Sequence, residues 1–159
     1  MTFRLARPLY RDSYYKYEKQ SNEGTGVLSQ LFDENALPYY AAHGWKGHGG
    51  LDIPAPLGMA IRAAHSGWVN AVETNPLVDG GLAVNVLTHD NYAGIYYETY
   101  YGHCKEVLVH VGNTVTPQTI LGLVDSTGES TGNHLHFGLK QKRYKGGPQR
   151  NSSFETLNR

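Results

Sequence analysis

The sequence ILGLVDSTGESTGNHLHFGL, residues 120–139, contains two short apolar runs separated by a loop rich in Gly, Ser and Thr. Short apolar runs of this kind, bounded by Gly, Pro, Asn or Asp, are typical of β-strands. They recur along the chain, and we expect strands at residues 59–64, 67–72, 82–87, 95–101, 107–111, 120–124 and 134–139. The breakers between them leave little room for a ten-residue helix, and only residues 28–35 form a weak helical candidate. The sequence therefore predicts a mostly β fold with few short helices.

The composition excludes several classes of partner. The chain has 159 residues, with 14 Lys and Arg against 14 Asp and Glu, so its formal net charge is +0. This balance argues against phosphate-led binding of nucleic acid and against a polybasic membrane anchor. No apolar stretch approaches the ~18 residues of a membrane helix, so we expect no membrane insertion. The single cysteine excludes an intramolecular disulfide and a multi-cysteine metal site, so a metal would need His and carboxylate ligands.

We expect residues 1–159 to form a single domain, because a chain of about 100–200 residues can bury enough surface to fold alone. We also expect a monomer, although no sequence feature determines the oligomeric state. Residues 1–26 are predicted to be a Tyr-rich extension, in which 11–26 forms a strand pair or a mobile entry segment. Residues 27–140 form the core and 141–159 a tail. The basic stretch 140–147 is expected to be a solvated face or a loose terminus, with Phe154 and Leu157 pinning the tail back. Met1 to Pro8 lacks the apolar run of a signal peptide, so we expect no secretion leader.

The motif NHLHF, residues 133–137, places two imidazoles two positions apart. Side chains alternate between the faces of a strand, so His134 and His136 point the same way while Leu135 and Phe137 face the core. The preceding Gly/Ser/Thr loop would deliver this strand to an open rim. Such a pair either binds a metal ion or, in the alternative interpretation, consists of two polar residues on a solvated face.

A second cluster, KGHGGLD at residues 46–52, adds a carboxylate. In a straight strand the Cα atoms of His48 and Asp52 would lie about 13 Å apart, at ~3.3 Å per residue, near the limit that one ion can bridge. A bend at Gly49 and Gly50 would bring the two side chains together, because glycine permits φ values that other residues resist. The alternative is an aspartate ending a turn beside an unrelated histidine.

Together the clusters predict a catalytic zinc site. Two His and one carboxylate, from His48, Asp52 and His136, would leave a fourth tetrahedral position open for water. His134 would then stand beside the open position, and His103, in the motif YYGH, could approach from another strand. One of these two histidines could accept a proton from water while the other stabilises the oxyanion or protonates the leaving amine.

The same residues resemble a known family. HGGLD at 48–52, PLGMAIRAAHSGWV at 56–69, YYGH at 100–103 and VGNTVTPQTILGLVDSTGESTGNHLHF at 111–137 are similar to the lysostaphin-type, LytM-like zinc endopeptidases, which cut peptidoglycan peptide crosslinks. The resemblance spans about residues 30–139. It implies an antiparallel β architecture of the duplicated hybrid motif type, with a groove floored by a large sheet and walled by loops. Residues 27–140 would then be the metallopeptidase core.

The resemblance also implies the roles of the site residues. The zinc ligands of the family fall on His48, Asp52 and His136, with one zinc per chain, and its two catalytic histidines on His103 and His134. The implied substrate is a peptidoglycan peptide, cut at a D-Ala crosslink or at a glycine bridge. The alternative is a non-catalytic wall-binding or assembly module, which would not need the two catalytic histidines.

Other features bear on setting and substrate choice. The expected lack of a leader suits a phage-type lysis enzyme released by a holin, a virion-associated enzyme, or a bacterial protein exported by another route.

Cys104 stands where the family more often has Leu, and we interpret it as a core substitution, the alternative being a redox-sensitive thiol. Residues 75–81 and 92–100 look like altered groove loops that would set substrate choice.

Overall fold

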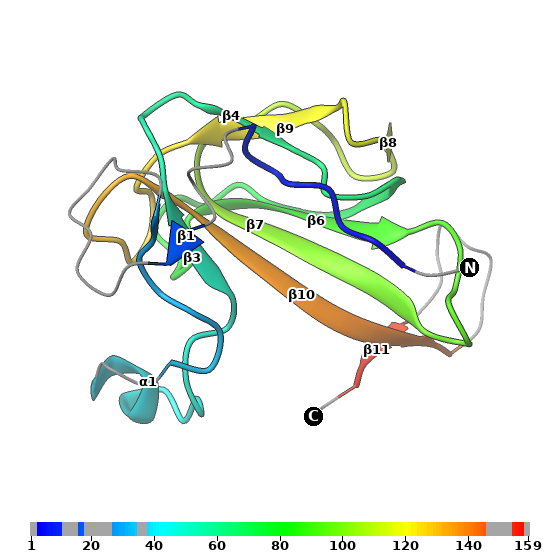
Figure 1. Cartoon of the computed structure of the whole chain (residues 1–159), viewed down its shortest axis with the longest axis horizontal. Coiled ribbons are helices and arrows are strands. Elements are labelled where there is room, and N and C mark those ends of the chain that lie inside the picture. The colour runs from blue at the N-terminus through cyan, green and yellow to red at the C-terminus, as the bar shows by residue number, and fades with distance from the viewer. Residues whose placement is uncertain (1–2, 11–15, 18–26, 35–37, 146–153, 158–159) are drawn as a thin grey trace.

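The computed structural model describes residues 3–10, 16–17, 27–34, 38–145 and 154–157, and most of these lie in strands (Figure 1). Nine strands form one antiparallel sheet with the order β11-β10-β7-β6-β5-β8; β3 pairs with β10, and β4 joins through β9 to β7. The strands are β1 (Lys16–Tyr17), β2 (Val27–Leu28), β3 (Leu51–Pro54), β4 (Ala60–Arg62), β5 (Gly67–Glu73), β6 (Leu82–Thr88), β7 (Tyr96–Val107), β8 (Thr114–Val115), β9 (Ile120–Val124), β10 (His134–Tyr144) and β11 (Phe154–Thr156).

The predicted mostly β architecture is confirmed, and helix is confined to one turn in the described part of the chain, α1 (Pro38–Ala42). None of the helical structure described there is long and apolar enough to cross a membrane. The predicted helix at 28–35 is wrong. Its backbone pairs with β3 instead, since the Ser29 N–H donates to the Asp52 carbonyl at 3.0 Å and the Gln30 carbonyl accepts from the Asp52 N–H at 2.9 Å.

The predicted strand at 107–111 is wrong, and the strand predicted at 134–139 runs further than expected. The expected strand at 107–111 is absent because β7 runs from Tyr96 to Val107 and the chain then turns, with the Gly112 N–H bonded to the Val69 carbonyl at 2.8 Å. Residues 140–144 are not a loose terminus, since β10 continues to Tyr144, but their side chains are mostly exposed, as the predicted solvated face requires. Strand β11 pairs with this end of β10, so the tail is held against the sheet as predicted. Of the segment 11–26, only β1 lies within the described residues, and it pairs in parallel with β2.

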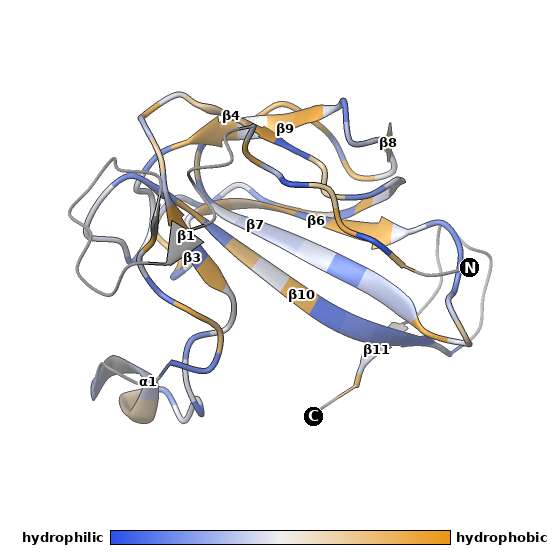
Figure 2. Cartoon of the chain, in the orientation of Figure 1, coloured by the Kyte–Doolittle hydropathy of each residue, from blue (hydrophilic) through white to orange (hydrophobic). Residues whose placement is uncertain are grey.

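The core lies between two layers. Figure 1 shows β4 and β9 above the long sheet that contains β6, β7 and β10. Their facing side chains are fully buried, among them Ile61 on β4, Leu121 on β9 and Leu135 on β10. Figure 2 shows that β9 is largely hydrophobic whereas the far half of β10 is hydrophilic. In the first half of β10 the two faces alternate, since Leu135 and Phe137 are buried in the core while His134 and His136 are half-buried on the opposite face.

A buried polar network joins β7 to the segment between β4 and β5. The Tyr101 hydroxyl accepts from the Ala64 N–H at 2.7 Å and lies 2.9 Å from the Thr99 hydroxyl oxygen. Thr99 in turn lies 2.9 Å from Nε2 of His65, whose Nδ1 lies 3.0 Å from the Ser66 carbonyl. Burial lowers the pKa of His65, which favours the neutral ring that this arrangement needs. The network fixes β7 against the upper layer.

We expect Tyr101→Phe to destabilise the protein by about 1–3 kcal/mol, because it removes the hydroxyl that accepts from the buried Ala64 N–H. Urea unfolding at pH 7 would measure the loss. Tyr10→Phe is the matched control, since the Tyr10 side chain is 66% exposed. Equal stability of the two variants would contradict a structural role for the Tyr101 hydroxyl.

Candidate metal centre

The pairing of β3 with β10 builds one side of the site. The two strands are antiparallel, and their register places Asp52 directly opposite His136 and Pro54 opposite His134. Residues opposite each other in a sheet share a face, so the carboxylate of Asp52 projects toward the histidine that faces it. The Nδ1 atom of His136 lies 2.8 Å from the Asp52 Oδ1 atom. The predicted shared face of His134 and His136 is confirmed, since the Asp52 Oδ1 atom also lies 3.5 Å from the His134 Nε2 atom.

His48 reaches the same point from the loop before β3. Its backbone is tied to residues 33 and 34, with the His48 N–H donating to the Glu34 carbonyl at 3.0 Å. The predicted approach of His48 to Asp52 is confirmed. The predicted role of Gly49 and Gly50, to adopt φ values that other residues resist, is wrong. Neither Gly49 nor Gly50 has a positive φ. Gly50 passes so close to β10 that a Cβ atom there would overlap the Phe137 carbonyl oxygen, so glycine supplies space rather than an unusual dihedral angle.

Three potential ligand atoms form a compact triangle at this point. The His48 Nε2 atom lies 3.0 Å from Asp52 Oδ1 and 2.9 Å from His136 Nδ1. With the 2.8 Å separation given above, all three edges are slightly shorter than the roughly 3.3 Å between adjacent ligands around a tetrahedral ion with bonds of ~2 Å. His48, Asp52 and His136 thus form the group that could hold a metal ion among the described residues.

A backbone carbonyl orients the His48 ring so that its Nε2 atom can bind a metal ion. The Nδ1 atom of His48 lies 3.1 Å from the Leu31 carbonyl oxygen. A carbonyl can only accept, so Nδ1 carries the proton, and in the neutral ring the Nε2 lone pair faces the triangle. Burial would raise the pKa of Asp52, but its close contacts with His134, His136 and His48 outweigh that effect and hold the pKa far below its usual range. The donor set is therefore one carboxylate and imidazole nitrogens, as a divalent metal requires.

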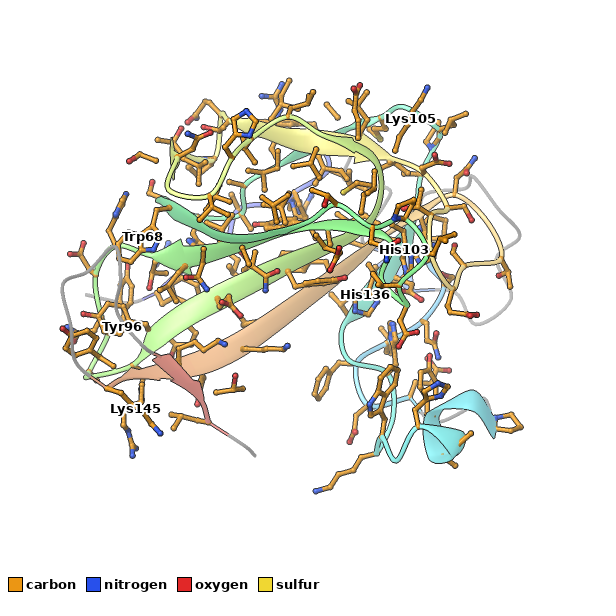
Figure 3. The ribbon with its side chains drawn as sticks, turned by 180° about the vertical axis from the view of Figure 1, so that it is seen from behind. Trp68, Tyr96, His103, Lys105, His136 and Lys145 are labelled. Atoms are coloured by element: carbon orange, nitrogen blue, oxygen red, sulfur yellow. The ribbon has the colours of Figure 1, made fainter. Side chains whose placement is uncertain are left out.

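His103 and His134 lie side by side next to the triangle, with ring centroids 4.5 Å apart (Figure 3, where His103 and His136 mark the site). The His103 Nδ1–H donates to the Thr127 carbonyl at 2.6 Å, and the His134 Nδ1–H donates to the Gly132 carbonyl at 2.8 Å. Each ring therefore keeps its Nε2 atom for chemistry. All five residues that the sequence singled out come together here, from β3, β7, β10 and the loop before β3.

The two histidines differ in basicity. Burial, and then the charge of His134, lower the pKa of His103 to about 4. Burial also acts to lower the pKa of His134, but the hydrogen bond to Asp52 and its negative charge prevail and raise it. The pair therefore combines one nitrogen that stays unprotonated near neutrality with one that holds a proton more readily.

His103 occupies a position that simple strand alternation would not allow. Gly102 pairs with His136, so its neighbour His103 should point into the core. A positive φ of 60° at His103, together with register shifts around Cys104, turns its ring toward the site instead. Histidine is among the residues that tolerate this left-handed conformation. Cys104 then faces the core and is buried, as predicted, and burial raises the pKa of its thiol to about 12.

The Thr127 side chain holds the loop that precedes β10 against β7. Its hydroxyl donates to the Cys104 carbonyl at 2.8 Å and accepts from the Leu82 N–H at 3.1 Å, while its carbonyl fixes His103. Sequence reasoning did not find Thr127 or the carbonyls of Leu31 and Gly132, because a backbone acceptor leaves no signature in residue type. The Gly/Ser/Thr composition of residues 125–133 was the available signal.

The family model of peptidase family M23 matches residues 46–149, which include all five site residues. The chain belongs to peptidase family M23. The predicted family resemblance is thereby confirmed, and this M23 domain has the fold of its relatives. It superposes on the catalytic domain of lysostaphin from Staphylococcus simulans with a TM-score of 0.61 and 23% identity, covering 79% of this chain and 86% of the other. The catalytic domain of the prophage-encoded M23 protein EnpA from Enterococcus faecalis gives 0.59 and 28%, with 80% and 86% covered.

Two curated relatives show how the M23 domain compares with longer proteins. Peptidoglycan DD-endopeptidase ShyB of Vibrio cholerae is 32% identical over 90 residues, which are 57% of this chain and 20% of the relative. DD-carboxypeptidase/endopeptidase Mpg of Neisseria meningitidis is 37% identical over 96 residues, which are 60% and 20%. The chain thus matches about a fifth of the length of these relatives.

We expect His103 to stay neutral down to acidic pH. Its pKa is lowered to about 4 in the folded protein from about 6.5 in an unfolded chain, so below pH 6.5 the unfolded state binds more protons. The stability of the metal-free protein should therefore fall as the pH decreases from about 6.5 toward 4. Histidine NMR titration and urea unfolding would measure both effects. His103→Asn, which tolerates the same backbone conformation, should show a shallower fall. A titration midpoint of His103 at or above 6.5 would contradict the assignment.

Proposed function

We propose that this M23 domain is a zinc-dependent endopeptidase that hydrolyses amide bonds in peptidoglycan peptides. One observation carries the proposal: a triangle of ligand atoms with edges of 2.8–3.0 Å lies beside two histidines whose Nδ1–H groups are both bound to carbonyls. The names of the curated relatives, a peptidoglycan DD-endopeptidase and a DD-carboxypeptidase/endopeptidase, support a peptidoglycan peptide as the substrate.

In this proposal His48, Asp52 and His136 hold one zinc ion. Their donor atoms suit zinc, because two imidazole nitrogens and one carboxylate oxygen are the usual ligands of catalytic zinc and leave a fourth position open. When bound, zinc acts as a Lewis acid that polarises a carbonyl group and lowers the pKa of water. The Leu31 carbonyl supports the site by keeping the His48 ring in the required tautomer.

The remaining two histidines move protons. One of them accepts a proton from the attacking water at Nε2, and the other donates a proton to the leaving amine or hydrogen-bonds to the oxyanion. Their bonds to the Thr127 and Gly132 carbonyls serve both states. A ring that gains a proton at Nε2 keeps its Nδ1–H on the carbonyl, whose partial negative charge stabilises the imidazolium. The similarity to prophage-encoded EnpA supports the phage-type lysis setting that we propose for this activity.

Hydrolysis of purified peptidoglycan tests the proposal. We expect the protein to release new peptide termini, to stop when a chelator removes its metal, and to recover when zinc is restored. Mass spectrometry of the fragments would name the bond that is cut. Binding to peptidoglycan without any release of termini would favour the non-catalytic module instead.

Two substitutions should separate the metal ligands from the catalytic pair. His136→Ala removes a ligand and should lose both zinc and activity. His134→Ala should retain zinc and lose rate by ~10²-fold or more, the size expected for a general acid or base. Elemental analysis and rate measurement would distinguish them, with the exposed His110→Ala as control. Zinc loss in His134→Ala with zinc retention in His136→Ala would mean that the two roles are exchanged.

A further inference from the structure

A hollow of about 560 Å³ lies on the polar face of the long sheet, beside the metal centre. Its floor is one row of residues across three adjacent strands, because Ala71 on β5 pairs with Asn85 on β6, and Asn85 pairs with Tyr100 on β7. Val78, Asp79 and Gly80 form a wall, and Glu73 closes the end of β5. The wall belongs to residues 75–81, the segment that the sequence predicts to be an altered groove loop.

The hollow adjoins the residues of the metal centre. The ring of Tyr100 packs edge-on against the ring of His136, with centroids 5.8 Å apart. The Gly80 carbonyl accepts from the His103 N–H at 2.7 Å. Tyr100 therefore stands between the hollow and the metal ligands, and the wall of the hollow is bonded to a catalytic histidine. A peptide held across the centre would place a neighbouring side chain at Tyr100.

Two glycines hold the Tyr100 ring in this place. A Cβ atom at Gly80 would overlap the Tyr100 hydroxyl, and one at Gly102 would lie 2.7 Å from its Cε1 atom. Neither glycine has a positive φ, so their role is to leave room for the ring. The loop before β10 fixes the wall as well, since the Glu129 N–H donates to the Asp79 carbonyl at 2.8 Å.

The lining of the hollow carries two negative charges and no positive ones. Its charged side chains are Glu73 and Asp79, and Asn85 and Tyr100 add polar groups that can accept a hydrogen bond. Burial, with smaller effects from Cys104 and these carboxylates, raises the pKa of Tyr100 to about 12. The phenol thus stays neutral at working pH and can donate or accept. With Ala71, Val72 and Val78 also in the lining, it suits a cation on a flexible apolar stem rather than a carboxylate.

We propose that Tyr100 and the hollow beyond it form a specificity site for a substrate residue next to the scissile bond whose side chain ends in an ammonium group. The ring of Tyr100 contacts the stem of that side chain, and the carboxylates of Glu73 and Asp79 attract its charge. This inference rests on the proposed peptidase function and adds to it the substrate group that the enzyme selects.

The test compares one peptidoglycan peptide in two forms, with its side-chain amine free and with it acetylated. Wild-type enzyme should cleave the free form with a KM about fivefold lower than the KM for the acetylated form. A fivefold change corresponds to the upper end of the binding energy of a single exposed ion pair. The double variant Glu73→Gln/Asp79→Asn should lose this preference while kcat and zinc content remain. Glu106→Gln is the control, because it removes one exposed carboxylate that does not line the hollow.

Gly80→Ala provides a second test that does not alter charge. Its methyl group must displace the Tyr100 hydroxyl, so the single variant should raise KM for the free amine form about as much as Tyr100→Ala. In the Tyr100→Ala background the same change should have no further effect on KM, because the clash is gone. A double-mutant cycle would measure this coupling.

The outcomes separate this inference from the function on which it rests. If wild-type enzyme cleaves neither form, the proposed peptidase function fails. If it cleaves both forms with equal KM, or if the preference survives Glu73→Gln/Asp79→Asn, the peptidase function stands and the ammonium site is overturned. Additive effects of Gly80→Ala and Tyr100→Ala would overturn the role of Tyr100.

Discussion

The antiparallel register of β3 against β10 is the constraint on which the site depends. It places Asp52 opposite His136, and the Asp52 carboxylate then lies within 3.5 Å of nitrogen atoms of three histidines. A slip of one residue would turn Asp52 to the other face of the sheet and leave the histidines without their anion. The apolar partners Ile53 and Leu135, both fully buried and paired with each other, prevent that slip because it would expose them.

Close backbone approach shapes the rest of the centre. Gly50 lets the chain pass against β10, and Gly80 and Gly102 make room for the Tyr100 ring. Backbone carbonyls then set the rings of three histidines by accepting from Nδ1. These contacts fix the orientation of each ring, so each imidazole presents a chosen nitrogen. Preorganisation of this kind limits the rearrangement that the reaction itself would need.

Much of this arrangement could be predicted from the sequence, and the reasons for the failures are physical. Strand alternation is local, so the shared face of His134 and His136 follows from their spacing alone. The placement of His103 does not, because its ring reaches the site only through a left-handed residue and a bulge that alternation cannot anticipate. The far half of β10 is polar along its length, and its pairing with β7 and β11 depends on residues distant in sequence. Residues 28–30 are extended because β1 and β3 supply hydrogen-bond partners, which local propensity cannot reveal.

The central claim is that three side chains hold one zinc ion, and its position in a crystal tests this most directly. Crystals grown with zinc would give diffraction data on both sides of the zinc absorption edge. We predict a single anomalous peak at bonding distance, ~2 Å, from His48 Nε2, Asp52 Oδ1 and His136 Nδ1. A peak bound by His103 and His134 without His48, or an active crystal form with no peak at this triangle, would contradict the account.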